Sequence, residues 1–165
     1  MRALLCLDGS NTDRLARGTF SLLNPDGLHI ALLYVIDSGP GHEMERMRQR
    51  FVGLGQRGAH LLAQVMQAEQ EAGEQILAAA QTLLRERWPG GPPAADQLEP
   101  ILLRGRPEQE IVRLAAEQRI DLILIGARRV GGPGEPPHPP GPKSVGHVAR
   151  FVLDHAPCPV LLLRP

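Results

Sequence analysis

Hydrophobic residues along this chain form five short continuous runs, and the stretches between them carry apolar residues at helical spacing. The runs cover residues 2–7, 28–36, 98–104, 121–126 and 159–164. Runs of this length without polar alternation are typical of strands that are buried on both faces of a parallel sheet. Strands and helices are therefore expected to alternate along the whole chain.

The stretches between these runs carry stripes of apolar residues at helical spacing, and each stripe predicts one helix. The first helix is expected to be capped by Thr12 or Asp13 and to bury the stripe Leu15, Thr19, Leu22 and Leu23. The longest stripe covers residues 59–88, and glycines interrupt the helical pattern just before it. This helix is expected to bury the residues at helical spacing, Leu62, Val65, Met66, Ile76, Leu77, Ala80, Leu83 and Leu84. The last helix is expected to bury the stripe Val145, Val148, Ala149, Val152 and Leu153.

This alternation predicts one α/β domain over residues 1–165, an open parallel sheet with helices on both faces. Pro100 lies within the third run, which places that strand at an edge of the sheet, where a missing N–H is tolerated. Ligands of such sheets bind beyond the carboxyl ends of the strands. The Pro- and Gly-rich segment 131–142 is expected to be a loop insertion at that rim.

Composition limits the classes of partner. The 18 basic and 18 acidic residues balance and aromatic residues make up 3%, so we expect no nucleic-acid partner. No run approaches the roughly 20 apolar residues of a membrane span, and no signal-peptide pattern is present, which predicts a cytoplasmic protein without membrane contact. Cys6 and Cys158 have no disulfide-framework or CxxC spacing, so both are expected to be reduced.

A loop with phosphate-site features follows the fourth run. A Walker-type loop needs glycine immediately before Lys143, but Pro142 stands there and has no N–H to donate. We therefore expect Ser144 only to cap the last helix. Arg128 and Arg129 lie at the ligand-binding rim, where they can hold a phosphate through bidentate contacts or remain solvated.

Other catalytic patterns are missing from the sequence. Histidines and a cysteine cluster near the end of the chain, but their spacing matches neither HxxxH nor CxxC, so no metal site is expected. No GxSxG turn is present either. We expect no enzymatic activity.

Three segments are together specific: "LLCLDGSNTD" at the first run, "GRPEQEIVRLAAEQRIDLILIGAR" in the middle and "GHVARFVLDHAPCPVLLLR" at the end. With these the chain resembles the universal stress protein family from end to end, except for residues 37–97. The resemblance implies an adenine-nucleotide-hydrolase-like fold with strand order 3-2-1-4-5. It also implies a homodimer through the last strand and, in some members, bound ATP or AMP.

The family's nucleotide binders share a motif after the fourth strand, namely Gly, two residues, Gly, nine residues, Gly, then Ser or Thr. Here Gly126 matches the first glycine and Gly146 the last, whereas Arg129 replaces the middle glycine and His147 replaces the hydroxyl residue. Between Arg129 and Gly146 lie 16 residues. The small residues of the motif let backbone N–H groups approach phosphate, so these changes predict weak or absent ATP binding.

The adenosine end of the motif is better kept. Asp8, Gly9 and Ser10 match the family's turn after the first strand, and Val35 matches the residue whose backbone meets adenine in the binders. Asp8 fits two roles equally, contact with ribose or adenine and acceptance of turn N–H groups. Three functions stay open: a stress-response module that works through its dimer, an ATP- or AMP-binding regulatory module, and a slow ATP hydrolase.

Overall fold

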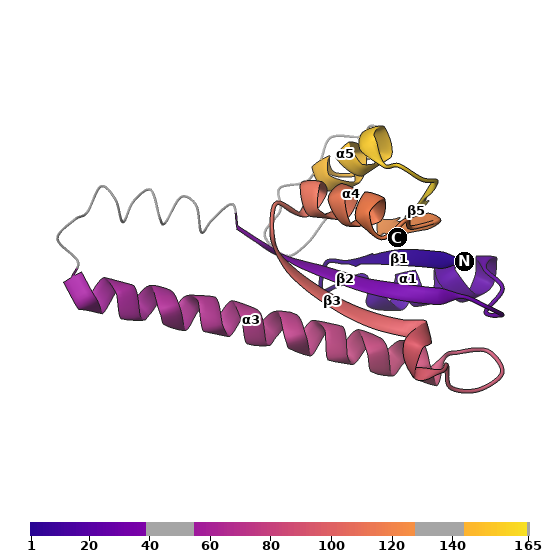
Figure 1. The fold of residues 1–165 in the computed structure, drawn as a ribbon, viewed down its shortest axis with the longest axis horizontal. Coiled ribbons are helices and arrows are strands. Elements are labelled where there is room, and N and C mark those ends of the chain that lie inside the picture. Colours follow the sequence, from indigo (N-terminus) through magenta and orange to yellow (C-terminus); the bar gives the residue numbers. More distant parts are fainter. Residues whose placement is uncertain (39–54, 128–143, 165) are drawn as a thin grey trace.

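The computed structural model describes residues 1–38, 55–127 and 144–164. Within these ranges the chain forms a parallel five-stranded sheet in the expected order β3-β2-β1-β4-β5 (Figure 1). The strands are β1 Arg2–Leu7, β2 His29–Asp37, β3 Leu98–Gly105, β4 Leu122–Gly126 and β5 Val160–Leu163. The helices are α1 Thr12–Leu22, α3 Gly55–Glu86, α4 Pro107–Glu117 and α5 His147–His155, with a short 3-10 turn, η1, at Ala95–Gln97.

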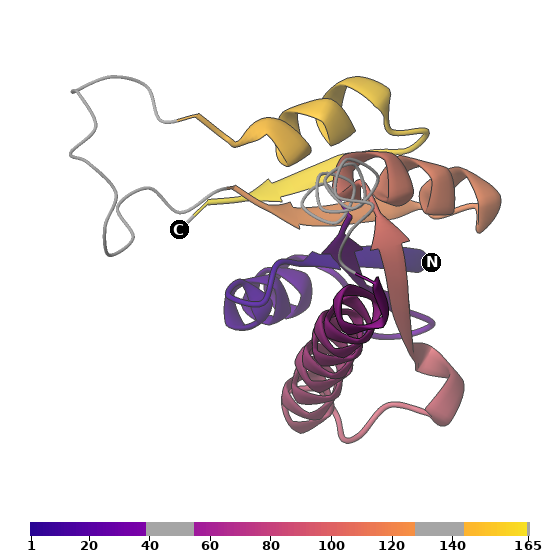
Figure 2. The ribbon, with the colours of Figure 1, turned by 90° about the vertical axis from the view of Figure 1, so that its left-hand side faces the viewer.

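Helices cover both faces of the sheet, α1 and α3 on one side and α4 and α5 on the other (Figure 2). Successive side chains of a strand point to opposite faces. In β1, Ala3, Leu5 and Leu7 therefore pack with α1 and α3, whereas Leu4 and Cys6 pack with α4 and α5. Because both faces are buried, β1 reads as one continuous apolar run.

The prolines mark the two edges of the sheet. Pro100 lies in β3, which pairs only with β2, as predicted from the missing N–H. At the other edge β5 pairs only with β4, and Pro159 lies immediately before its first residue. The edge of β5 away from β4 has no described strand beside it.

The first helix differs from the sequence prediction at both ends. Its N-cap is Asn11, so Thr12 and Asp13 lie inside the helix. Leu22, the last helical residue, is 61% exposed and was wrongly expected to be buried, whereas Leu15 and Thr19 are buried and Leu23 packs against the core, as predicted. An apolar stripe predicts which face of a helix packs against the sheet, but it does not predict how far along the helix the sheet extends.

The longest helix extends past the sheet in Figure 1, which explains two further errors. Helix α3 begins at Gly55 and not at residue 59, and Met66 within it is 44% exposed. Leu153 on α5 is also 44% exposed and was wrongly expected to be buried. None of the described helices is both long and apolar enough to cross a membrane.

One glycine lets α3 lie close to the sheet. A Cβ at Gly73 would lie 2.8 Å from Cδ1 of Leu102 and 3.2 Å from Cδ1 of Tyr34. Real side chains do not approach so closely, so glycine at this position sets the distance between α3 and the sheet. This contact supports Tyr34 from behind.

Candidate functional site

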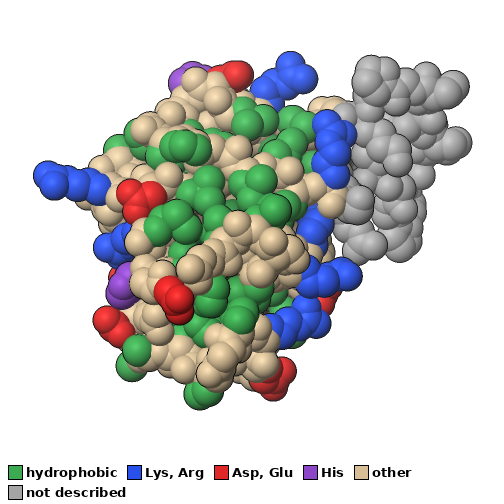
Figure 3. All heavy atoms as spheres, turned by 90° about the vertical axis from the view of Figure 1, so that its right-hand side faces the viewer, with side chains coloured by type: hydrophobic (Ala, Val, Ile, Leu, Met, Phe, Trp, Pro, Cys, Tyr) green, Lys and Arg blue, Asp and Glu red, His purple; other side chains and the backbone are tan. Residues whose placement is uncertain are grey.

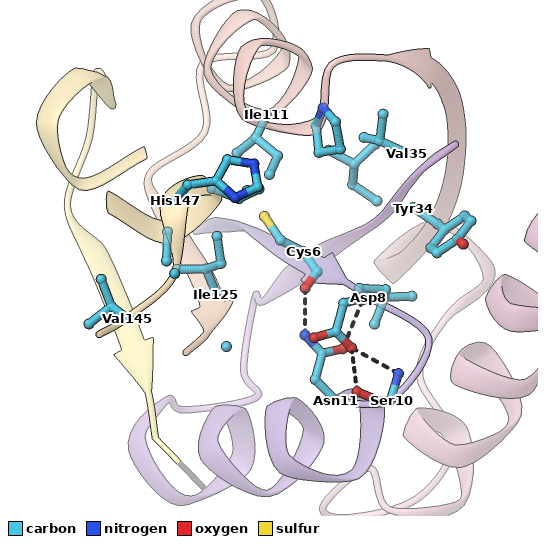
Figure 4. A pocket seen from close by; sticks show the side chains of 17 residues that line it. Cys6, Asp8, Ser10, Asn11, Tyr34, Val35, Ile111, Ile125, Val145 and His147 are labelled. Atoms are coloured by element: carbon cyan, nitrogen blue, oxygen red, sulfur yellow. Dashed lines mark hydrogen bonds between the residues drawn. The ribbon is translucent and has the colours of Figure 1, made fainter. Parts of the chain in front are cut away.

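A pocket of about 550 Å³ opens at the carboxyl ends of β1, β2 and β4 (Figure 4). This is the rim where ligands of open α/β sheets bind. Its walls come from β1 and the following turn, the end of β2, the start of α4, the end of β4 and the start of α5. The apolar part of the wall comprises Cys6, Leu7, Leu33, Tyr34, Val35, Pro107, Ile111, Ile125, Val145, Val148 and Ala149.

The turn after β1 is held by two side chains. Oδ1 of Asp8 accepts hydrogen bonds from the backbone N–H of Ser10 at 2.8 Å and from its hydroxyl at 3.0 Å. Asn11 is 3% exposed; its Oδ1 accepts from the N–H of Asp8 at 3.1 Å, and its Nδ2 donates to the carbonyl of Cys6 at 3.0 Å. Gly9 takes a φ of 82°, which strongly favours glycine. Asp8 therefore has the turn role through Oδ1, and no described residue donates to its Oδ2.

The end of β2 offers backbone groups to the pocket. Its pairing with β1 ends at Leu7 and Tyr34, whereas its pairing with β3 continues to Asp37 and Gly105. At Val35 the edge of β2 that faces β1 therefore has no strand beside it, and Val35 lines the pocket. Peptide groups on such an edge can hydrogen-bond a ligand.

The first turn of α5 forms the opposite wall. Its N-cap, Gly146, has a φ of 92° and no side-chain cap bond, and the next residues His147, Val148 and Ala149 line the pocket. The first N–H groups of a helix have no partner within the helix and favour negative charge. Ser144 was wrongly expected to cap this helix; its Oγ accepts a hydrogen bond from the N–H of Gly146 at 3.2 Å, two residues earlier than a cap would stand.

Behind Gly126, at the end of β4, lies an arginine from α1. A Cβ at Gly126 would collide with Nη2 of Arg14 and would lie 3.1 Å from Nδ2 of Asn11. All three side-chain nitrogens of Arg14 are enclosed, and no described residue accepts a hydrogen bond from them. Gly126 itself lines the pocket, so the guanidinium lies directly behind the pocket wall.

The thiol in the pocket is not activated. Burial raises the pKa of Cys6 far above its ordinary value, and the neighbouring Cys158 raises it further. Both cysteines are free, as expected. A neutral thiol is a poor nucleophile and a poor metal ligand, so Cys6 acts as part of the apolar floor. Among the described residues, no group of three or more His, Cys, Asp or Glu side chains could hold a metal ion.

Residues 1–164 match the sequence profile of the universal stress protein family. The chain belongs to this family. A universal stress protein of Thermus aquaticus is 32% identical over 107 residues, which cover 65% of this chain and 66% of that protein, just under two thirds. The universal stress protein YxiE of Bacillus subtilis is 24% identical over 164 residues, 99% of this chain and 98% of that protein.

Two solved structures show the same fold. Universal stress protein UspA of Lactobacillus plantarum superposes with a TM-score of 0.67 at 21% identity, covering 99% of this chain and 97% of that one. The universal stress protein of Archaeoglobus fulgidus in complex with dAMP superposes with a TM-score of 0.61 at 18% identity, covering 99% and 97%. At these identities the likeness establishes the universal stress protein fold of this chain.

Most residues that the family resemblance selected meet at one pocket. Six line it together: Asp8, Ser10, Val35, Gly126, Gly146 and His147. Gly9 shapes the turn without lining the pocket. Arg128, Arg129 and the segment 131–142 lie outside the described residues.

Sequence reasoning missed Asn11 and Arg14 in this universal stress protein. Asn11 follows the matched turn directly, and an Asn at that point is a known signal for side-chain bonds to the turn backbone. The sequence does not indicate the position of Arg14, because an arginine in the first turn of an amphipathic helix is normally expected to be solvated. Only the packing of α1 beneath the end of β4 reveals its position.

Proposed function

We propose that this universal stress protein is a non-enzymatic stress-response module whose pocket binds the adenosine part of an adenine nucleotide. The observation that carries this proposal is the pocket itself. Its volume of about 550 Å³ falls within the range of small-ligand sites. Its wall is mostly apolar, with a few polar groups at defined places, as such sites usually are.

The wall divides into parts that suit the parts of a nucleoside. Leu33, Val35 and Ile111 provide an apolar surface for a planar base, and the unpaired edge of β2 provides peptide groups for its ring nitrogens. Asp8 suits the ribose hydroxyls, because a carboxylate is a strong acceptor and its Oδ2 has no described donor. The dAMP complex of the Archaeoglobus fulgidus protein supports this class of ligand.

Phosphate binding through the loop after β4 is expected to be weak. The first turn of α5 presents N–H groups beside Gly146, which favours an anion. His147 stands where the family's binders have a compact hydroxyl, and Arg129 replaces a glycine of their motif. We therefore propose that the backbone cage of the family's ATP binders is not formed here.

The same pocket gives no support for hydrolysis. Among the described residues that line it, Asp8 is the only carboxylate and His147 the only imidazole, and none is a lysine or an arginine. We propose that bound nucleotide acts as a signal and not as a substrate. Inorganic phosphate release from ATP at no more than the buffer rate is the expected result, and release that depends on His147 would instead support a slow hydrolase.

Calorimetry with adenosine and AMP tests the binding proposal. The variant Asp8→Asn keeps an oxygen for Ser10 but removes the charge, so it should weaken adenosine binding about ten- to a hundred-fold. The matched control Asp26→Asn changes an exposed turn aspartate that does not line the pocket and should leave binding unchanged. Binding of neither ligand would favour a module that works through protein contacts alone.

We also propose a homodimer through β5. All four residues of β5 are only partly buried, and its outer edge lies at the border of the sheet. Exposed strand edges invite pairing with another chain. Hydrophobic side chains also gather at the centre of the side that faces right in Figure 1 (Figure 3). Light scattering should give twice the mass of one chain at micromolar concentration.

The cytoplasmic location stays a prediction.

A further inference from the structure

Two parts of the pocket wall rest on one turn of α3. Tyr34 lines the pocket, and a Cβ at Gly73 of α3 would lie 3.2 Å from its Cδ1. Three residues further along the same helix, Cδ1 of Ile76 lies 3.4 Å from the place of a Cβ at Gly9, in the turn after β1. Residues three apart share one face of a helix. This face of α3 therefore supports both the end of β2 and the turn that holds Asp8.

These two parts of the wall are adjacent in the sheet and in the pocket. Leu7, which precedes the turn, pairs in register with Tyr34. Figure 4 shows Tyr34 and Asp8 on the same side of the pocket, which both of them line. A ligand that contacts the carboxylate of Asp8 therefore lies beside Tyr34 as well.

Helix α3 is held on the sheet on both sides of Gly73. Before this residue, Glu69 pairs with Arg104 of β3 at 2.7 Å. After it, Leu77 and Ala80 are 5% and 0% exposed in the core beneath the helix. Because the helix is held at both places, a side chain added at residue 73 displaces its neighbours and not α3.

The two neighbours of Gly73 differ in how they can move. A Cβ there would lie 2.8 Å from Cδ1 of Leu102, which is the end of a flexible side chain and can turn to another rotamer. The ring of Tyr34 is rigid and moves only as a whole. A side chain at residue 73 therefore displaces this ring away from α3 and changes the pocket wall that it forms.

We propose that Gly73 is a positioning residue of this pocket, because its lack of a side chain lets Tyr34 stay against α3 in its place in the wall. This inference rests on the proposed function. Gly73 does not line the pocket, so it acts on a ligand only through Tyr34. Coupling between two sites is reciprocal, and a bound ligand that rests on Tyr34 therefore also stabilises the position of α3.

Calorimetry of the full chain with adenosine tests the role of Gly73. In Gly73→Ala the affinity should fall about three- to ten-fold, because Tyr34 is displaced. Gly18→Ala is the matched control, since Gly18 is also a helical glycine in a tight contact. A Cβ at Gly18 would collide with Cδ1 of Leu163, and Gly18 does not line the pocket. This variant should be less stable than the native protein and bind adenosine equally well.

A double-mutant cycle tests whether the effect passes through Tyr34. Tyr34→Val removes the ring that the added methyl group would displace. In this background Gly73→Ala should lower the adenosine affinity by less than about two-fold. Should Gly73→Ala not fold, Gly73→Ala combined with Leu102→Ala removes the contact of 2.8 Å and keeps the one with Tyr34.

A spectroscopic readout separates this role from a purely structural one. Tyr34 is the only tyrosine in the sequence, so a chain labelled with fluorotyrosine gives one fluorine NMR signal, from residue 34. The signal should shift when adenosine binds, and it should also shift in Gly73→Ala without ligand. Gly18→Ala should leave the signal where it is in the native protein, because loss of stability alone does not move Tyr34.

The outcomes distinguish the two proposals. An unchanged adenosine affinity in Gly73→Ala, or a loss that is additive with that of Tyr34→Val, would overturn the role of Gly73 and leave the proposed function standing. A native protein that does not bind adenosine would overturn the proposed function. In that case the fluorine signal decides on Gly73: a shift in Gly73→Ala but not in Gly18→Ala supports the positioning of Tyr34, and an equal response in the two variants rejects it.

Discussion

The guanidinium of Arg14 occupies the space that a side chain at residue 126 would need. A Cβ built at Gly126 collides with Nη2 of Arg14 and lies 3.2 Å from its Cζ. In the family motif, the glycine at this position lets a phosphate approach the backbone closely. In this chain, the contact with Arg14 is by itself enough to require glycine at residue 126. Gly126 is therefore the point at which α1 packs against the pocket wall, although α1 and the end of β4 are far apart in the sequence.

Replacement of Gly126 by alanine should destabilise the fold by about 1–3 kcal/mol, the usual cost of overpacking a tight site. Arg14→Ala in the same chain should recover part of this loss, because it removes the group that the methyl meets. Urea denaturation of the two single variants and the double variant measures the coupling. Additive losses, within about 0.5 kcal/mol, would show that the two residues do not compete for the same space.

Asn11→Ala should lower the free energy of unfolding by about 2 kcal/mol, since the substitution leaves the N–H of Asp8 and the carbonyl of Cys6 without their partner. The same variant should also weaken adenosine binding, because Asp8 loses its support. Asn24→Ala is the matched control: Asn24 also accepts a turn N–H, from Asp26 at 3.0 Å, but it is exposed. Denaturation curves in which both variants lose equally would contradict the structural role of Asn11.

The strands could be predicted from the sequence because a strand that is buried on both faces needs apolar residues at every position, which produces an unbroken apolar run. Pro100 located one edge of the sheet for a physical reason, the missing N–H, and the order β3-β2-β1-β4-β5 followed from the family resemblance. Helix ends were less accurate. Gly55 and Gly58 lower helix propensity, yet α3 runs through them, so local preference did not decide where the helix begins.

The site was predictable only as far as the family motif reaches. Asp8, Val35 and Gly126 come from three different strands, and the topology brings their carboxyl ends together. Arg14 could not be predicted, because its enclosure depends on a residue 112 positions later having no side chain. No periodicity or motif within α1 records that relationship.

Asp13 should make stability depend on pH below neutrality. A hydrogen bond from Arg87, at the end of α3, lowers the pKa of this carboxyl, and Arg17 lowers it further. The contribution is complete above the unfolded pKa of about 3.9 and is lost as pH falls through the lower folded value. Melting temperatures of the native protein and Asp13→Asn, measured from pH 7 to pH 2.5 at low salt, should converge at the acid end. A constant gap would show that Asp13 stabilises by packing and not by charge.

ATP should bind this protein no tighter than roughly high-micromolar, near −5 to −6 kcal/mol. The first turn of α5 provides N–H groups, which suit a single phosphate group. The second and third phosphates would need the small residues of the family motif, where this chain has Arg129 and His147. Purified protein should accordingly carry no ATP, and calorimetry with ATP and magnesium should show no gain over AMP. A dissociation constant of about a micromolar or below that is weakened by His147→Ala would show that the loop after β4 still binds the triphosphate.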